Sequence, residues 1–80
     1  MPKIKFSDFL GAQLKEFRMQ YKKKAVDVAK YMDKSPAYIS KLEKGQIQQI
    51  EKKELVKMAN FITGVEDGYI IFCEKIAQNI

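Results

Sequence analysis

SPAYISKLEKG, residues 35–45, is the stretch of this sequence that decides the fold. Its first residue, a serine, can cap free N–H groups at the start of a helix, and Pro36 fits the first turn, where its missing N–H costs nothing. Ile39 and Leu42 then form one apolar face, and the final glycine suits the left-handed position that ends such a helix. The other face carries Ala37, Ser40, Lys41 and Lys44. The stretch therefore predicts a short helix with one buried face and one face toward solvent.

Two further helices are expected before this one. The first begins behind the N-cap Ser7 and is closed by residues 22–24. Its apolar residues recur at helical spacing and lie on one stripe: Leu10, Leu14, Phe17 and Tyr21. The second helix is shorter, spans about 25–32, and turns three apolar residues inward: Val28, Ala29 and Met32. Asp33 and Lys34 form the turn that leads into residues 35–45.

Two more helices are expected after it. The fourth runs over about 51–62, and Gly64 lies in the break that follows. Its inward stripe is Leu55, Met58, Ala59 and Ile62. The fifth spans about 66–80, with the stripe Phe72, Cys73, Ile76 and Ile80. Residues 69–73 favour a strand by composition but continue this helical stripe, and no alternating segment is long enough for a convincing strand. The sequence thus predicts an all-α fold of five helices in a single domain, 1–80.

The composition of the chain argues against an enzyme. Eighty residues with 46% hydrophobic content suit one compact core but not a deep two-domain cleft. With no His and a single Cys, the commonest general base, the metal-ligand clusters and the Cys-His nucleophile pair are all missing. The four glycines form neither a phosphate loop nor a dinucleotide turn. We therefore expect no catalysis, no metal, no cofactor and no small-molecule substrate.

The cysteine content and the hydropathy bear on the compartment. Cys73 is the only cysteine, so it has no disulfide partner, and we expect it to be a reduced thiol in the core. No run approaches the apolar length of a membrane span, and the start of the sequence lacks the apolar region of a signal peptide. These features predict a cytoplasmic protein with no membrane partner.

Positive charge is concentrated in the first part of the chain. Residues 1–45 carry 11 Lys and Arg against 5 Asp and Glu, a net +6, whereas residues 46–80 carry 4 against 5, a net −1. Together these give the overall charge of +5. A field concentrated in this way favours a polyanion such as nucleic acid, although many Lys-rich helices serve solubility alone.

The segment KAVDVAKYMDKSPAYISKLEKG, residues 24–45, resembles the helix-turn-helix of the Cro and phage-repressor class, the XRE family. The similarity extends from Leu10 to about Val65, with the motif itself over about 25–44. The residues that carry it most specifically are Ser35, Tyr38, Ile39, Ser40, Leu42, Glu43 and Gly45. The resemblance implies a five-helix, lambda-repressor-like domain. It also implies a sequence-specific transcriptional regulator of prokaryotic or phage type, with helix 35–44 in the major groove of double-stranded DNA.

The resemblance further implies roles for particular residues. The positions that face bases are occupied by Pro36, Ala37, Ser40 and Lys41. The first two offer only apolar contact, whereas the last two can form hydrogen bonds. The candidates for phosphate contact are Lys22, Lys23, Lys24, Lys34, Ser35, Tyr38, Lys44, Gln46 and Gln48. Arg18 and Glu43 match positions that often form a buried pair between the first and third helices, and a buried charge requires its partner.

Three of these assignments have a structural alternative. Residues 22–24 either bind phosphate at the start of the second helix or form a solvated helix end. Tyr38 either reaches a phosphate through its hydroxyl or packs against the second helix. Residues 46–50, QIQQI, either offer donors to phosphate or form a connection with Ile47 and Ile50 in the core.

Several positions depart from the family pattern. Ala25 stands where the family commonly has a Gln that bonds phosphate, so that contact is absent. Asp33 stands in the turn where Gly is usual, and Lys34 stands where a small apolar residue is usual; Asp tolerates a left-handed backbone better than most residues. Ala25, Pro36 and Ala37 keep a second hypothesis open. It is a protein-interaction module of the same fold, of antirepressor or toxin-binding type, without specific DNA binding.

The C-terminal helix is a candidate for self-association. Ile70 and Ile71 widen its apolar surface beyond what one side of a small bundle can cover. We expect a homodimer, which would present two recognition helices to successive major grooves about 34 Å apart. The candidate interface residues are Tyr69, Ile70, Phe72, Cys73, Ile76 and Ile80. The alternatives are that this helix folds back over the first and fourth helices or packs on a downstream domain.

Overall fold

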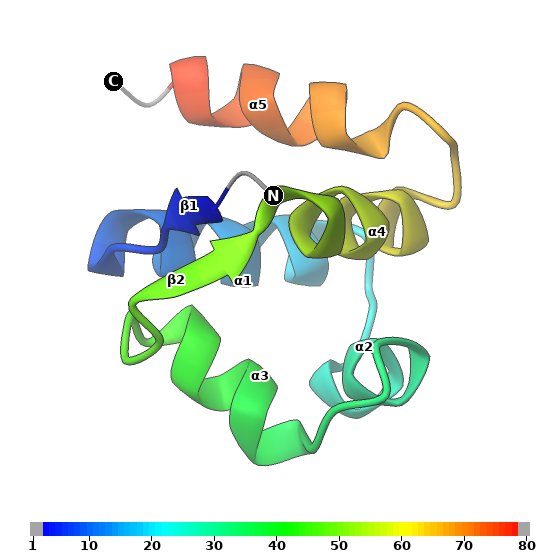
Figure 1. Cartoon of the computed structure of the whole chain (residues 1–80). Coiled ribbons are helices and arrows are strands. Elements are labelled where there is room, and N and C mark those ends of the chain that lie inside the picture. The colour runs from blue at the N-terminus through cyan, green and yellow to red at the C-terminus, as the bar shows by residue number, and fades with distance from the viewer. Residues whose placement is uncertain (1–2, 79–80) are drawn as a thin grey trace.

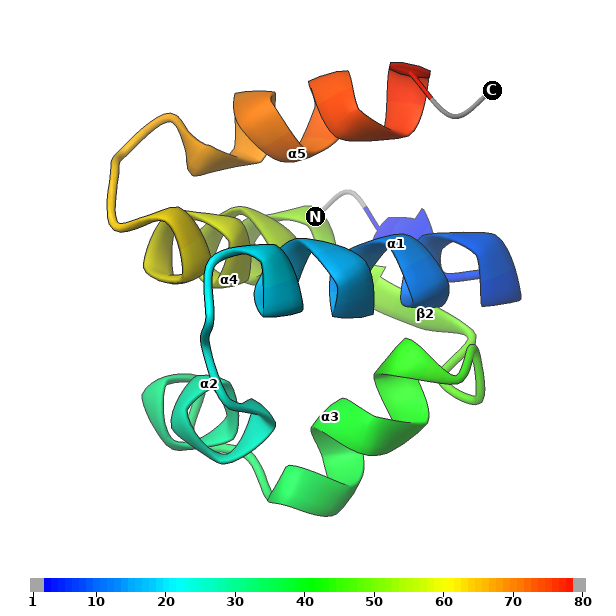
Figure 2. The same ribbon diagram turned by 180° about the vertical axis from the view of Figure 1, so that it is seen from behind.

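The computed structural model describes residues 3–78, which form five helices and one small sheet. In chain order the elements are β1 (Lys3–Lys5), α1 (Asp8–Gln20), α2 (Ala25–Tyr31), α3 (Pro36–Glu43), β2 (Gln49–Glu51), α4 (Lys52–Thr63) and α5 (Gly68–Gln78). α1 and α4 form a middle layer, α5 covers one side of it, and α2 and α3 lie on the other (Figures 1 and 2). The predicted five-helix fold is confirmed. Within the described residues, no helix has the length and apolar character needed to cross a membrane.

The helix-turn-helix segment begins and ends where its sequence predicts. Ser35 Oγ accepts a hydrogen bond from the Tyr38 N–H at 3.1 Å, which caps α3. Gly45, just beyond the helix, has a φ of +74°, a left-handed conformation that L side chains rarely adopt. Asp33 in the turn between α2 and α3 has a φ of +58°, so the turn keeps its left-handed backbone without a glycine. Ser7 caps α1 in the same way as Ser35 caps α3.

The expectation that the chain contains no strand is wrong at two short segments. β1 and β2 pair antiparallel with Ile4 opposite Ile50, and the Phe6 N–H donates to the Gln48 carbonyl at 2.8 Å. Each strand has three residues, too few for an alternating pattern to be recognised. The partners are also distant in sequence, so the pairing depends on the folded helices that bring the two segments together.

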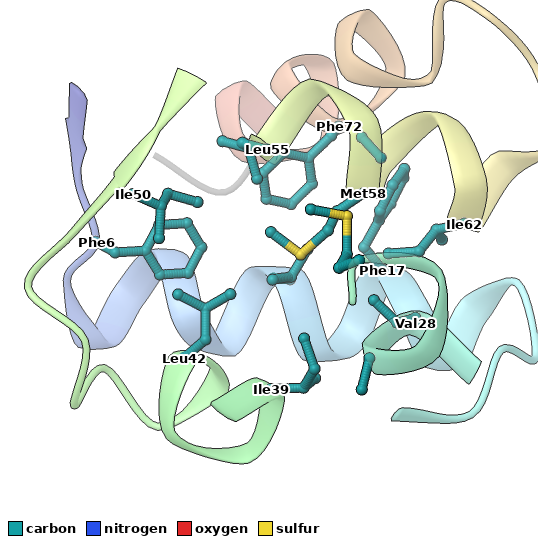
Figure 3. Close-up of a cluster of buried hydrophobic side chains, with 14 residues drawn as sticks. Phe6, Phe17, Val28, Ile39, Leu42, Ile50, Leu55, Met58, Ile62 and Phe72 are labelled. Carbon is teal, nitrogen blue, oxygen red and sulfur yellow. The ribbon is translucent and has the colours of Figure 1, made fainter. Parts of the chain in front are cut away.

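The core lies between the layers, and every helix contributes to it (Figure 3). The inward residues predicted for the second, third and fourth helices are all buried: Val28, Ala29, Met32, Ile39, Leu42, Leu55, Met58, Ala59 and Ile62. Leu14 and Phe17 of α1 are buried as well, whereas Tyr21 after its end is 39% exposed. Phe6, which belongs to none of the predicted helices, is 2% exposed and lies beside Ile50 (Figure 3).

The last helix folds back across α1 and α4 (Figure 1). Phe72 is fully buried with its ring centre 5.1 Å from that of Phe17, which removes it from the predicted dimer interface. Cys73 is exposed, so the expectation of a core thiol is wrong. Successive helix residues point about 100° apart, and Cys73 therefore leaves the core when Phe72 points into it. The predicted interface residue Ile80 lies outside the described residues.

Candidate nucleic-acid interface

The position of α3 depends on an ion pair between Arg18 and Glu43. Arg18 Nε donates to Oε2 of Glu43 at 2.7 Å, and Nη2 donates to Oε1 at 3.1 Å. Both side chains are largely shielded from water, with exposed fractions of 12% and 6%. Two parallel charge-assisted hydrogen bonds of this kind are strong and directional. The pair therefore joins α1 to the C-terminal end of α3.

Arg18 also orders the segment that leads into α2. Its Nη1 donates to the Lys23 carbonyl at 2.9 Å. The Lys23 N–H in turn donates to the Arg18 carbonyl at 3.0 Å, so both backbone polar groups of Lys23 are bonded to Arg18, just ahead of the N-cap residue Lys24. A single guanidinium thus connects α1, the start of α2 and the end of α3. The two helices of the motif are held in one relative arrangement through it.

Two glycines allow α1 to approach the end of α3. A Cβ at Gly11 would lie 2.6 Å from the Glu43 carbonyl oxygen, so any side chain there would push α1 and α3 apart. A Cβ at Gly45 would lie 2.7 Å from Asp8 Cα, at a position that already has a left-handed backbone. These close approaches hold the C-terminal end of α3 against the N-terminal half of α1.

The residues predicted to face bases share one surface of α3, which we name the α3 ridge. It consists of Pro36, Ala37, Ser40 and Lys41. Ser40 is half-buried and the other three are exposed. They form two pairs of residues four positions apart, and such pairs are neighbours on successive turns of a helix. The buried residues of α3 point the other way, into the core, so the ridge faces solvent.

Exposed lysines stand at the ends of α2 and α3. They are Lys22, Lys24, Lys34 and Lys44. Lys23 differs, because it is half-buried and its Nζ lies 5.6 Å from the centre of an aromatic ring on α4. The structure therefore leaves four of the predicted phosphate-binding lysines on the surface around the motif and directs the ammonium of the fifth toward α4.

Tyr38 lies on the side of α3 that faces β2 and α4. Its ring lines a depression of about 200 Å³ together with Lys34 and Glu54, and it packs against the core. Lys34 Nζ lies 5.2 Å from the centre of the ring. Burial, and to a lesser extent the charge of Glu54, raises the pKa of Tyr38, so the hydroxyl is protonated at neutral pH. This geometry favours the packing alternative, with β2 and α4 rather than α2 as the neighbours.

The connection between α3 and β2 combines buried and exposed residues. Ile50 is 4% exposed and Ile47 packs against the core, which agrees with the structural alternative for residues 46–50. The side chains of Gln46 and Gln48 are exposed beyond the end of α3. Phosphate contact by these two amides stays a prediction.

One feature near this interface has no counterpart among the predicted site residues. Tyr31 of α2 and Phe61 of α4 stack with their ring centres 4.4 Å apart and their planes inclined by 18°. Tyr31 is 46% exposed, although it is a large aromatic residue. The sequence holds a partial signal, because Tyr31 falls outside the inward stripe of its helix. The identity of the stacking partner follows only from the packing of α2 against α4.

Comparisons with known proteins agree with this geometry. The family model described as Helix-turn-helix matches residues 14–66, more than half of the chain. The crystal structure of the clp gene regulator ClgR from Corynebacterium glutamicum has a TM-score of 0.69 at 24% identity and covers 98% of this chain and 83% of that chain. This likeness shows a shared fold. No curated protein matches the sequence at a significant level.

Proposed function

The chain belongs to the XRE-type helix-turn-helix family, and on this premise we propose that it is a sequence-specific, DNA-binding regulator of transcription of prokaryotic or phage type. The observation that carries the proposal is the α3 ridge, which faces solvent from a helix anchored by a buried ion pair. Helix-turn-helix proteins place the second helix of the motif in the major groove, while the first crosses the DNA backbone. In this proposal α3 enters the groove and the start of α2 meets the phosphates.

The α3 ridge offers two kinds of base contact. Lys41 suits guanine, whose O6 and N7 accept hydrogen bonds in the major groove, and Ser40 can bond to more than one base. Pro36 and Ala37 carry no hydrogen-bonding group in their side chains and suit the methyl group of thymine. Lys41 is therefore the residue to which we assign most of the discrimination between base pairs.

Contacts to phosphate would position the domain on the duplex without reading its sequence. The exposed candidates are Lys22, Lys24, Lys34, Ser35, Lys44, Gln46 and Gln48. Lys23 and Tyr38 suit this role less well, because both side chains are half-buried and turn toward α4. The net charge of +6 on residues 1–45 supplies the attraction and makes the affinity fall as salt rises.

We extend the proposal to a homodimer that forms through the outer side of α5. Ile70 is 57% exposed, Cys73 is exposed, and Tyr69 and Ile76 are half-buried beside them. A two-fold axis along this surface would pair it with itself.

Selection of bound duplexes from a random-sequence pool tests the proposal. We expect one sequence motif to be enriched. Retention of the protein on heparin should fade with moderate salt, because phosphate binding releases counterions. Failure to enrich any motif, together with no salt-sensitive retention, would favour a protein-interaction module of the same fold instead.

A further inference from the structure

A second surface lies beside the DNA-binding motif and is built by α2, α4 and the residues that follow α4. At its centre Tyr31 and Phe61 are stacked, and Tyr31 and Val65 are each 46% exposed. Large apolar side chains that gather on the surface of a small domain commonly mark an interaction site. We name this the aromatic surface, and it comprises Tyr31, Phe61 and Val65 with the lysines Lys23, Lys30 and Lys57.

The aromatic surface contains two adjoining depressions that meet at the stacked rings. One of about 350 Å³ is lined by Lys23, Asp27, Lys30, Tyr31 and Phe61. The other, of about 510 Å³, is lined by Tyr31, Asn60, Phe61, Gly64, Val65 and Glu66. The first has two lysines and one aspartate beside the rings, and the second has Val65 beside the rings with Glu66 at its edge. Each has room for side chains of a partner, and the rings form a wall common to both.

Two of the three lysines of this surface lie over aromatic rings, and none of the three has a carboxylate partner among the described residues. Lys57 Nζ lies 5.3 Å from the centre of the Tyr31 ring, and Lys23 Nζ lies 5.6 Å from that of Phe61. No carboxylate within residues 3–78 forms an ion pair with Lys23, Lys30 or Lys57. Cation–π contacts hold the two ammonium groups next to apolar surface while leaving donors available. The group that is complementary to this arrangement is a carboxylate next to an apolar side chain.

We propose that the aromatic surface binds an acidic peptide segment of a partner protein, with an apolar side chain of that segment against Tyr31, Phe61 and Val65. Carboxylates of the segment pair with Lys23, Lys30 and Lys57, which steers the encounter and fixes the register. The apolar anchor supplies most of the affinity, since aromatic contacts that exclude water dominate protein interfaces. None of the three apolar residues belongs to the α3 ridge, so the apolar anchor and the residues that face bases lie on different surfaces.

Single-stranded nucleic acid fits this surface less well. A base that stacks on a protein needs a free aromatic face. Here Tyr31 and Phe61 each use one face on the other ring, and each also has a lysine ammonium within 6 Å of its centre. Duplex DNA would satisfy the lysines through its phosphates but would leave the exposed apolar groups without a partner.

Fluorescence polarisation of the whole chain with two labelled probes tests the proposal. One probe is a short peptide of Glu and Asp around a central Phe, and the other replaces that Phe with Ser. We expect the Phe probe to bind at least about tenfold more tightly, because only it carries the apolar anchor. We also expect Tyr31→Ser and Lys57→Glu each to weaken the Phe probe by at least about tenfold.

Lys15→Glu is the matched control, because Lys15 is an exposed lysine on α1 that neither lines a depression of this surface nor lies over the ring of Tyr31 or Phe61. It should leave peptide affinity within about twofold of wild type. Circular dichroism verifies that each variant is folded, and affinity for duplex DNA, which the Tyr31→Ser variant should retain, is measured in parallel. Loss of peptide binding with DNA binding intact therefore distinguishes this proposal from the proposed DNA function.

Three results would overturn the proposal. The first is equal affinity for the Phe and Ser probes, or affinity for the Phe probe that the Tyr31 and Lys57 substitutions leave unchanged. The second is displacement of the Phe probe by single-stranded oligothymidine at a lower concentration than unlabelled peptide, which would assign the surface to nucleic acid. The third is a change in the NMR signals of Tyr31 and Val65 on dilution of the protein alone, which would assign the surface to a second copy of the chain.

Discussion

Arg18 uses three guanidinium nitrogens on two partners, the Glu43 carboxylate and the Lys23 carbonyl. Because both side chains of the ion pair are largely buried, removal of either one leaves an uncompensated charge in the protein interior. The free-energy cost of removing one partner is larger than the stability that the intact pair provides compared with two apolar side chains of similar volume. We therefore assign the pair an organising role: it makes one arrangement of α1, α2 and α3 much more favourable than others.

Glu43→Ala should lower the free energy of unfolding by about 3 kcal/mol, because it strands the Arg18 guanidinium in a largely buried position. For a domain of this size, the loss corresponds to a fall in melting temperature of more than about 10 °C. Thermal melting followed by circular dichroism measures the effect. Glu74→Ala removes an exposed carboxylate from α5 and is the control. A melting temperature like that of wild type would refute an anchoring role for the pair.

Lys41→Ala and Lys24→Ala should weaken DNA binding in different ways. Loss of Lys41 from the α3 ridge should relax the preference at one base pair by about 1 to 3 kcal/mol. Loss of Lys24, a phosphate candidate, should weaken all sequences alike and reduce the salt slope by about 1. Gel shifts on the selected site and on single-base variants of it, at several salt concentrations, measure both effects. If neither substitution changes the affinity for DNA, the protein-interaction hypothesis is favoured.

At the scale of whole elements, the β1–β2 ladder ties the N-terminal segment to the connection that follows α3. The ladder is short, but it delivers two buried side chains, Phe6 and Ile50, to the same part of the core (Figure 3). Leu42 of α3 lies next to them in that view. The two paired segments therefore support α3, because their buried side chains fill the space beneath its C-terminal half.

Phe6→Ala should destabilise the fold by about 3 kcal/mol or more, since it removes a buried ring and leaves a cavity under α3. Urea denaturation compared with wild type gives the change in unfolding free energy. Lys5→Ala alters the neighbouring exposed residue of β1 and should cost little. If both variants lost the same small amount of unfolding free energy, the strand would be a peripheral feature without influence on α3.

At the scale of the whole molecule, two surfaces lie on opposite sides of the α1–α4 layer. α2 and α3 lie on one side, and α5 covers the other (Figures 1 and 2). The outer side of α5 retains Ile70 at 57% exposure, while Phe72 on its inner side is fully buried. A substitution at Phe72 would therefore unfold the bundle and give no information about self-association.

Ile70→Glu should convert a dimer into a folded monomer, because it places a charge at the centre of the proposed interface without touching the core. Sedimentation of wild type and variant at high micromolar concentration measures the change. Met19→Glu is the matched control, since Met19 is 58% exposed on α1 and receives the same charge. A wild-type chain that sediments as a monomer under these conditions refutes self-association through α5.

The sequence by itself determined the helix-turn-helix. The Ser35 cap, the left-handed Gly45 and the spacing of Ile39 and Leu42 act within one or two helical turns, so each can be recognised in a short stretch of chain. The resemblance of residues 24–45 to a known family added the pairing of Arg18 with Glu43, which no local pattern contains. The charge difference between the two parts of the chain is likewise a property of the sequence alone.

Only the tertiary structure decided which apolar residues are covered and which are not. The stripe on α5 is wider than one side of a helix, and the packing of α1 and α4 selected Phe72 for the core and left Cys73 outside. The β1–β2 pairing and the stack of Tyr31 on Phe61 join segments that are far apart in the chain. Helical periodicity predicts which residues share one face of a single helix. These contacts depend instead on how separate elements are positioned against one another, and the packing of the whole core determines that position.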